Sequence, residues 1–217
     1  MQELPTYRPN DLFETSFRLN PNLPGFFPGA GGFFHGHASG SRRFLFFGTD
    51  FGTLSYQRGL ERTSGEPESN ETIRHLRKDI VEKAGIPLDA CFLTNAVLCV
   101  RLGNSGTETF PIWERYPDYV SACAQWHRAF IAKGRTKLIA LMGLPHLEFF
   151  GPILFPELSS HWAGLRTLKD VFKASKETFR LNTGTQVLLM HHPSHWPAYP
   201  AALKQRIIDH LATAASE

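Results

Sequence analysis

The sequence lacks the features that mark a secreted, membrane-spanning or cysteine-ligated protein. It has three cysteines, an odd number, and no Cys-x-x-Cys pair. This argues against a disulfide framework, a zinc ribbon and a cysteine-bound iron–sulfur cluster. We therefore expect reduced, buried thiols at Cys91, Cys99 and Cys123. The longest apolar runs, such as Leu138–Leu144, fall far short of the ~20 residues that cross a bilayer.

The amino terminus and the charge balance are equally unremarkable. Met-Gln-Glu-Leu-Pro has no basic or apolar stretch, so we expect no secretory signal, no membrane association and a cytoplasmic location. Lys and Arg number 23 against 20 Asp and Glu, a net charge of +3. This mildly basic balance permits contact with phosphates without demonstrating it. The sequence contains no internal repeat and no low-complexity tract.

What remains is an ordinary globular composition. With 217 residues, of which 42% are hydrophobic and 20% charged, the chain can bury a core without disulfides or a structural metal. We expect a single domain over residues 1–217. Its first 40 residues form a segment rich in Gly, Pro and Phe that we expect to pack on the rest. The Phe residues within Asn20–Gly40 either cap the core or line a pocket, and the first alternative is favoured.

Apolar runs alternate with amphipathic stretches through the rest of the chain. The runs predict four strands, and the stretches predict three helices. This order indicates a mainly parallel α/β sheet covered on both faces. The expected strands are Phe44–Phe47, Ala90–Val100, Leu138–Met142 and Gln186–Met190, and the expected helices are Ser69–Ala84 (capped by Ser69), Asp118–Lys133 and Pro200–Ala214.

Unusual polar residues follow or interrupt these strands. Asp50 comes just after the first strand, Asn95 lies within the second run, and His192 follows the last strand. In parallel sheets ligands bind beyond the carboxyl ends of the strands. Asn95 either makes a structural hydrogen bond to a neighbouring loop or reads a planar amide, and a single loop histidine is usually a surface residue. Together at one sheet edge, the three residues indicate a site.

The residues around these three positions carry a family resemblance. Gly48-Thr49-Asp50-Phe51-Gly52 resembles motif A of the uracil-DNA glycosylase superfamily, and His192-Pro193-Ser194-His195-Trp196 resembles its motif B. Phe92–Arg101 is similar to the strand between them, and Leu141-Met142-Gly143 is similar to a further strand that ends in glycine. The motifs occur in the family's order, and the resemblance covers about residues 40–205.

The resemblance implies a three-layer α/β/α fold with a central, mainly parallel four-stranded sheet. It also implies a monofunctional DNA glycosylase that needs no cofactor and acts on DNA containing uracil or another modified base. We expect a monomer. Such an enzyme flips the base out of the duplex, because the glycosidic bond is shielded within it.

The resemblance also assigns roles to individual residues. Asp50 would position the attacking water or stabilise the cationic sugar, and His192 would donate a hydrogen bond to the carbonyl oxygen of the departing base. Asn95 would bind the exposed edge of the flipped base. Ser194 would contact a phosphate. Trp196 would fill the gap left in the DNA or, as a structural alternative, pack in the core.

Motif A would supply the rest of the base pocket through Gly48, Thr49, Phe51 and Gly52, and it departs from the known families. Phe51 replaces the proline of family 1, and Gly52 replaces the tyrosine that excludes a 5-methyl group, so Gly52 leaves room there. Families with glycine at this place carry Asn or Ala where this chain has Asp50, so the motif is a hybrid. The cluster-binding cysteines of families 4 and 5 are missing.

Two further parts of the family pattern are not placed. The segment Arg58–Glu68 contains no aromatic residue to stack on the base, so Tyr56 or one of Phe26, Phe27, Phe33 and Phe34 is the candidate. The long spacing from Asn95 to His192 puts extra length in Leu144–Thr183, to which no function is assigned.

Competing interpretations concern metal binding, nucleic-acid binding and catalysis. His191, His192 and His195 do not predict a metal site, because Pro193 prevents helical pairing and no acid or cysteine is near in sequence. Scattered basic residues form a solvated face or a nucleic-acid groove, and they are Arg42, Arg43, Arg58, Arg62, Arg74, Arg77 and Lys78. The alternative function is a non-catalytic member of the superfamily that binds a nucleobase or DNA. A serine hydrolase is disfavoured, because no Gly-x-Ser-x-Gly motif occurs.

Overall fold

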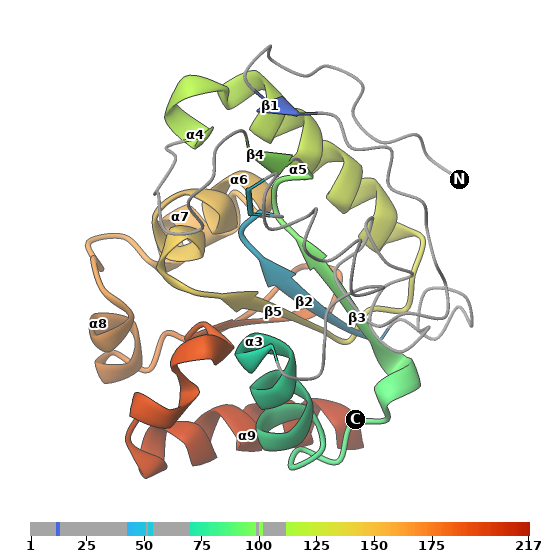
Figure 1. Ribbon diagram of the computed structural model, residues 1–217, viewed down its shortest axis with the longest axis vertical. Coiled ribbons are helices and arrows are strands. Elements are labelled where there is room, and N and C mark those ends of the chain that lie inside the picture. The colour runs from blue at the N-terminus through green and yellow to red at the C-terminus, as the bar shows by residue number, and fades with distance from the viewer. Residues whose placement is uncertain (1–11, 14–42, 51, 54–69, 99, 102–111) are drawn as a thin grey trace.

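The computed structural model describes residues 12–13, 43–50, 52–53, 70–98, 100–101 and 112–217. Its centre is a sheet in the order β3-β2-β5-β7-β6 (Figure 1). The first four strands in this order are parallel, and β6 pairs with β7 in the antiparallel sense. The strands are β2 (Phe44–Gly48), β3 (Cys91–Asn95), β5 (Leu138–Met142), β6 (Thr178–Arg180) and β7 (Gln186–Met190).

The predicted α/β class and parallel sheet are confirmed, and the predicted number of four strands was wrong. The fifth strand, β6, has three residues, none of them fully buried, and includes the charged Arg180. A short, half-exposed edge strand gives no apolar run in the sequence, which is why the pattern missed it. It lies within the Leu144–Thr183 insertion.

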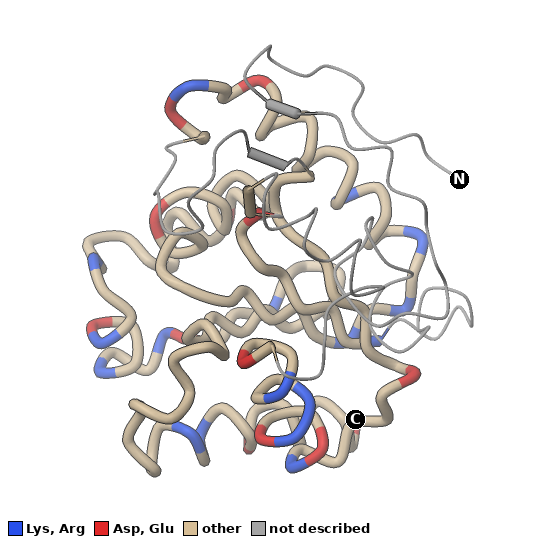
Figure 2. Tube along the Cα trace, viewed as in Figure 1, with Lys and Arg blue, Asp and Glu red and all other residues tan. Residues whose placement is uncertain are grey.

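The four parallel strands form the core because they are apolar along both faces. Nearly all their side chains are buried, and none of the four carries a charged residue. In Figure 2 the central strands are accordingly free of blue and red, while the charges lie on the surrounding helices and loops. Burial on both faces produces the continuous apolar runs from which these strands were predicted.

Helices cover both faces of the sheet. Figure 1 shows α5 (Pro117–Ala132) on one side and α3 (Glu71–Arg74) with α9 (Ala201–Ser216) on the other. These helices match the three predicted ranges within a few residues. The first continues as a π-helical segment, η2 (His75–Val81), and its cap is Asn70 rather than Ser69. The Asn70 side chain accepts hydrogen bonds from the backbone N–H groups of Thr72 and Ile73, which satisfies the exposed helix start.

The second predicted strand is shorter than expected. β3 ends at Asn95, and the backbone N–H groups of Ala96 and Val97 then donate to the carbonyls of Gly48 and Thr49 at 2.9 and 3.0 Å. Val100 and Arg101 belong instead to a separate strand, β4 (Val100–Arg101), which pairs with β1 (Leu12–Phe13). The apolar run continues in sequence to Val100, but the chain leaves the sheet after Asn95, halfway along that run.

Shorter elements complete the described structure. They are η3 (Leu88–Ala90), α4 (Ile112–Arg115), η4 (His146–Phe150), α6 (Gly151–Leu154), α7 (Glu157–His161), α8 (Leu168–Lys173) and η5 (Pro193–Ala198). The last of these carries motif B.

Several expectations fall outside the described residues. They concern the N-terminal segment, Tyr56, Phe51 and Cys99, and the single domain over residues 1–217 also stays a prediction. Cys91 and Cys123 are buried free thiols, as predicted. Among the residues that the structure describes, no helix combines the length and apolarity that a membrane span requires.

Candidate active site at the carboxyl edge of the sheet

The parallel register brings the ends of four strands to one edge of the sheet. Gly48 at the end of β2 pairs with Asn95 at the end of β3, and Met142 of β5 pairs with Met190 of β7. The residues that follow these strands therefore share this edge, although they are distant in sequence. The edge carries Asp50, Asn95 and His192, together with the turn at Gly143.

Asp50 is held within its own loop. Its Oδ1 accepts a hydrogen bond of 2.7 Å from the backbone N–H of Gly52. Gly52 has φ of +74°, a conformation that favours glycine. This glycine therefore has a backbone role in shaping the loop around Asp50, besides the room that its missing side chain leaves. Asp50 is partly buried and lies two residues after Gly48, which pairs with Asn95 at the end of β3.

Asn95 is a buried amide with an unused donor. The residue is 2% exposed, and its Nδ2 makes no hydrogen bond to any part of the chain that the structure describes. A buried donor without a partner costs about 1–3 kcal/mol, so such groups are rare unless a ligand or water completes them. Nδ2 therefore does not make the hydrogen bond to a neighbouring loop that the structural alternative requires. The group is suited to donating to a bound polar ligand.

His192 is held as a neutral ring with a defined tautomer. Its Nδ1 accepts the backbone N–H of Ser194 at 3.4 Å and lies 2.8 Å from the Ser194 hydroxyl. Because a backbone N–H can only donate, the proton of the neutral imidazole is on Nε2. Burial and the nearby His195 lower the pKa of His192 to about 4. At neutral pH His192 therefore offers a neutral Nε2–H donor.

The two remaining motif B residues act differently from one another. The Ser194 hydroxyl is engaged by His192, so Ser194 orients the imidazole. Trp196 is 4% exposed and belongs to the hydrophobic core, with its ring edge toward Tyr199. The short helix η5 turns this side chain inward, where it packs in the core. Burial favours the core-packing alternative, and the expectation that Trp196 fills a gap in DNA stays a prediction.

The structure adds two histidines that the sequence did not single out. His127 of α5 and His146 of η4 are both 0% exposed. His127 was recognised only as one position on the inward face of a helix, and His146 follows the Gly143 turn with no local signal. The ring of His127 packs edge-on against Phe47 of β2, with ring centroids 4.8 Å apart.

Both rings are neutral at physiological pH. Burial lowers the pKa of His127 to about 4, against the opposing effect of the Asn95 and Ala96 carbonyls. Burial also lowers the pKa of His146 to about 3, with His192 and His127 acting in the same direction and the carbonyls of Gly48 and Phe47 opposing. His146 is thus near both the end of β2 and His192.

The neighbouring His191 is separated from this group by its packing. Its ring stacks on Phe172, with centroids 5.5 Å apart and planes within 2°, and it also contacts Tyr199 at 3.9 Å. The described residues contain no group of three or more His, Cys, Asp or Glu side chains that could hold a metal ion.

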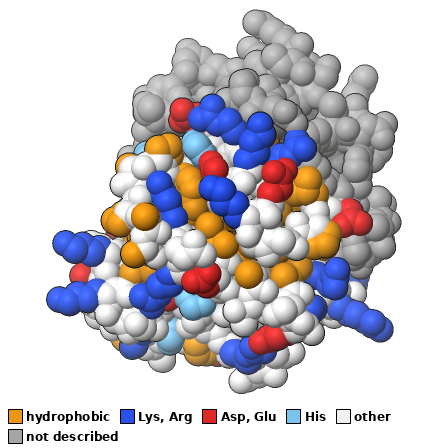
Figure 3. Space-filling model, turned by 90° about the horizontal axis from the view of Figure 1, so that it is seen from below, with side chains coloured by type: hydrophobic (Ala, Val, Ile, Leu, Met, Phe, Trp, Pro, Cys, Tyr) orange, Lys and Arg blue, Asp and Glu red, His pale blue; other side chains and the backbone are white. Residues whose placement is uncertain are grey.

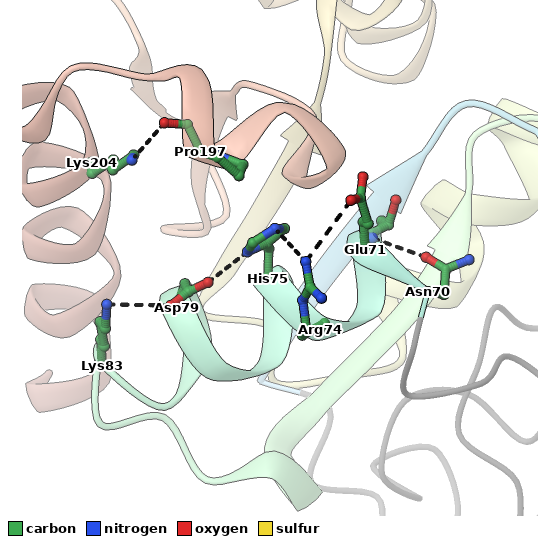
Figure 4. A network of polar contacts seen from close by, with 9 residues as sticks. Asn70, Glu71, Arg74, His75, Asp79, Lys83, Pro197 and Lys204 are labelled. Atoms are coloured by element: carbon green, nitrogen blue, oxygen red, sulfur yellow. Dashed lines mark hydrogen bonds and ion pairs between the residues drawn. The ribbon is translucent and has the colours of Figure 1, made fainter.

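Several basic residues of α3, of η2 and of the turn after it pair with nearby acids. Arg77 Nε lies 3.0 Å from Glu82, and Lys83 Nζ lies 3.3 Å from Asp79. Figure 4 shows the Lys83–Asp79 pair, in which Asp79 also contacts His75 at 2.6 Å. The face that Figure 3 shows accordingly mixes basic and acidic side chains. Such an arrangement is typical of a solvated face and favours that interpretation over a nucleic-acid groove.

One comparison with known proteins identifies a family for the chain. A model of the uracil DNA glycosylase superfamily matches residues 37–212, which include the five-stranded sheet and all three motif positions. A search of curated proteins gave no match. The family match covers most of the chain, and the matched region contains Asp50, Asn95 and His192 at one sheet edge. The chain therefore belongs to the uracil DNA glycosylase superfamily.

Proposed function

We propose that this protein is a monofunctional DNA glycosylase that hydrolyses the N-glycosidic bond of uracil, or of a related deaminated base, after the base is flipped out of DNA. The observation that carries the proposal is the unpartnered, buried Nδ2 of Asn95 on the same sheet edge as the neutral Nε2–H donor of His192. Both groups can donate to a planar base that presents carbonyl oxygens.

Breaking the glycosidic bond places negative charge on the base and positive charge on the sugar. His192 would stabilise the first charge and Asp50 the second. The bond between C1′ and the base nitrogen breaks with its electron pair leaving on the base, and a water oxygen forms the new bond to C1′. Negative charge grows on a carbonyl oxygen of the base, where His192 donates. Positive charge grows on the sugar, where the Asp50 carboxylate stabilises it or orients the water. The water proton leaves through Asp50 or solvent.

The neutral state of His192 suits this role. A preorganised donor stabilises developing charge without itself reorganising during the reaction. Because the pKa of His192 is lowered to about 4, the ring stays neutral through the physiological range and keeps its bond from the Ser194 N–H. Protonation would place a hydrogen on Nδ1 and break that bond.

Base selection rests on the end of β3 and the loop after β2. Asn95 would read the base edge through its amide, while Gly48, Thr49, Phe51 and Gly52 would form the surrounding wall. The lack of a side chain at Gly52 leaves space at the base 5-position. The phosphate contact of Ser194 stays a prediction, and it would draw on a residue whose hydroxyl already serves His192.

The test is a single-turnover assay with excess enzyme on single- and double-stranded DNA containing uracil, hypoxanthine or xanthine. We expect abasic product from at least one substrate. His192→Ala should lower the rate about 10²–10³-fold, the usual cost of removing one donor to a developing oxyanion. Asp50→Asn should also lower it strongly.

The matched controls are His191→Ala and Glu157→Gln. His191 adjoins His192 but is stacked between two aromatic rings, and Glu157 is an exposed acid on α7. Neither change should reduce the rate per folded molecule by more than about twofold. Tight DNA binding with no abasic product from any substrate would contradict glycosylase activity and favour the non-catalytic alternative.

A further inference from the structure

Five buried nitrogen atoms near the site have no hydrogen-bond partner in the described parts of the chain. They are Nδ2 of Asn95 and both ring nitrogens of His127 and of His146. Asn95 would use its nitrogen on the base, but the two histidines are 0% exposed and lie behind the strand ends. Their four nitrogens therefore need another explanation.

His127 lies behind the strand end that presents Asn95. It belongs to the middle of α5, packs on Phe47, and is close enough to the carbonyls of Asn95 and Ala96 for them to favour its protonated form. Neither ring nitrogen makes a hydrogen bond of good geometry to these carbonyls. An N–H group thus interacts with the carbonyls of Asn95 and Ala96 without reaching full hydrogen-bond geometry.

His146 has the same relation to the strand end that presents Asp50. It is close to the carbonyls of Gly48 and Phe47 and to the ring of His192. Its backbone N–H donates to the Gly143 carbonyl at 3.3 Å, so the Gly143 turn fixes its place. The two imidazoles are near enough to disfavour each other's protonation.

Stability does not explain these imidazoles. A buried polar group without a partner destabilises the folded state, and an apolar ring of similar shape would fill the same space without that cost. The two rings are also fully enclosed by protein, so they do not act as surface donors. A role in holding backbone carbonyls accounts for the position of both imidazoles and for their ring N–H donors.

We propose that His127 and His146 are positioning residues, whose ring N–H groups hold the backbone at the ends of β3 and β2 and so set the separation of Asn95 and Asp50. This proposal rests on the proposed function. In the free protein the ring-to-carbonyl contacts are loose. When a base enters between the two strand ends, the carbonyls move onto the ring N–H groups and the hydrogen bonds form.

The test compares His127→Phe and His146→Phe with His161→Phe. His161 has a partner for its ring, because Nε2 lies 3.0 Å from the Lys176 carbonyl. We expect the first two variants to melt at the wild-type temperature or about 2–4 °C above it, while their single-turnover rates fall at least about tenfold. His161→Phe should melt lower and keep its rate. His146→Asn, which retains an N–H group, should recover part of the lost rate.

A second measurement uses ¹⁵N-histidine-labelled protein titrated with free uracil and with DNA containing an abasic site. We expect the ring nitrogen resonances of His127 and His146 to shift on binding, and those of His161 to stay in place. Rates within about twofold of wild type in both Phe variants, or rate losses that only follow lower melting temperatures, would overturn the proposal. So would unchanged ring resonances in a protein that binds the probe.

The two proposals fail in distinguishable ways. A wild-type protein that releases no base contradicts glycosylase activity, and the titration then still decides whether the histidines respond to a bound base. An active wild type with unaffected Phe variants contradicts the positioning role alone.

Discussion

Two polar clusters in this molecule differ in whether they hold a paired charge. The site cluster, defined as Asn95, His127 and His146, holds neutral groups whose nitrogens lack partners within the described residues. The edge cluster, defined as Glu177, Arg206 and His210, holds a charge. Glu177 Oε1 contacts the Arg206 guanidinium and accepts from His210 Nε2 at 2.9 Å, with the Glu177 side chain 1% exposed. Its other oxygen, Oε2, has no hydrogen-bond partner among the described residues.

The edge cluster ties elements together. Arg206 of α9 also donates to the Phe172 carbonyl in α8 at 3.1 Å, and the Glu177 carbonyl accepts from Leu189 of β7 at 2.7 Å. A buried carboxylate requires such compensation, because an unpaired charge in the interior is far more costly than an unpaired neutral dipole. We infer that the edge cluster contributes to the stability of the fold. The site cluster lowers stability, because its buried nitrogens lack partners.

The largest expected effect is a decrease in the protein's free energy of unfolding in mild acid, caused by the two histidines of the site cluster. The pKa values of His127 and His146 are lowered from 6.5 to about 4 and about 3, so the unfolded chain binds protons that the folded chain does not. Stability is therefore full above about pH 6.5 and falls as the pH drops toward 4, by up to about 1.4 kcal/mol per pH unit for each ring. Urea denaturation at pH 7, 6 and 5 measures this slope.

The control for this prediction is the double variant His127→Phe/His146→Phe. Because phenylalanine does not titrate, the double variant should show a markedly flatter dependence of unfolding free energy on pH. The partly buried rings of His191 and His192, whose pKa values are also lowered to about 4, leave a residual slope. An equal slope in the wild type and the double variant would contradict the assignment.

The second effect concerns the edge cluster, where a substitution should lower the free energy of unfolding without changing activity. Arg206→Met leaves the Glu177 carboxylate with only His210 and removes the bond to Phe172. We expect a loss of about 2 kcal/mol, below the ~3–5 kcal/mol of a fully enclosed pair, because the Arg206 side chain is 36% exposed. Base excision per folded molecule should not change. Lys83→Met, which breaks an exposed pair, should cost under about 0.5 kcal/mol.

The sequence predicted the central strands well because burial on both faces leaves an unmistakable pattern. β5 and β7 have the bounds expected from their apolar runs. β3 was predicted too long, since hydrophobicity does not report where a buried chain leaves a sheet. β6 was missed because its three residues are not fully buried and gave no apolar signal.

The site was predictable only as far as its residues follow strands. Asp50, Asn95 and His192 were placed on one edge because parallel strands end together. His146 was not found, since nothing in its neighbourhood in the sequence marks it and only the tertiary fold brings it beside Gly48. His127 lies among the buried residues of α5, so the sequence pattern does not distinguish it from an ordinary core residue. The burial of Trp196, which favours core packing, could not be predicted from the sequence.

The smallest expected effect compares two glycine turns, one at the site and one remote from it. Gly143 has φ of +105° and Gly164 has φ of +79°, so alanine at either position should cost about 1–2 kcal/mol through backbone strain. A Cβ at Gly143 would lie 3.7 Å from His192 Cβ, whereas a Cβ at Gly164 would meet nothing within 4 Å. The 3.7 Å distance is an ordinary van der Waals contact, so it does not displace His192. Backbone strain at Gly143 should shift the turn whose carbonyl accepts the His146 N–H, and Gly143→Ala should therefore slow base excision severalfold, whereas Gly164→Ala should not. Equal rates in the two variants, measured at matched folded fractions, would show that the turn after β5 does not position the site.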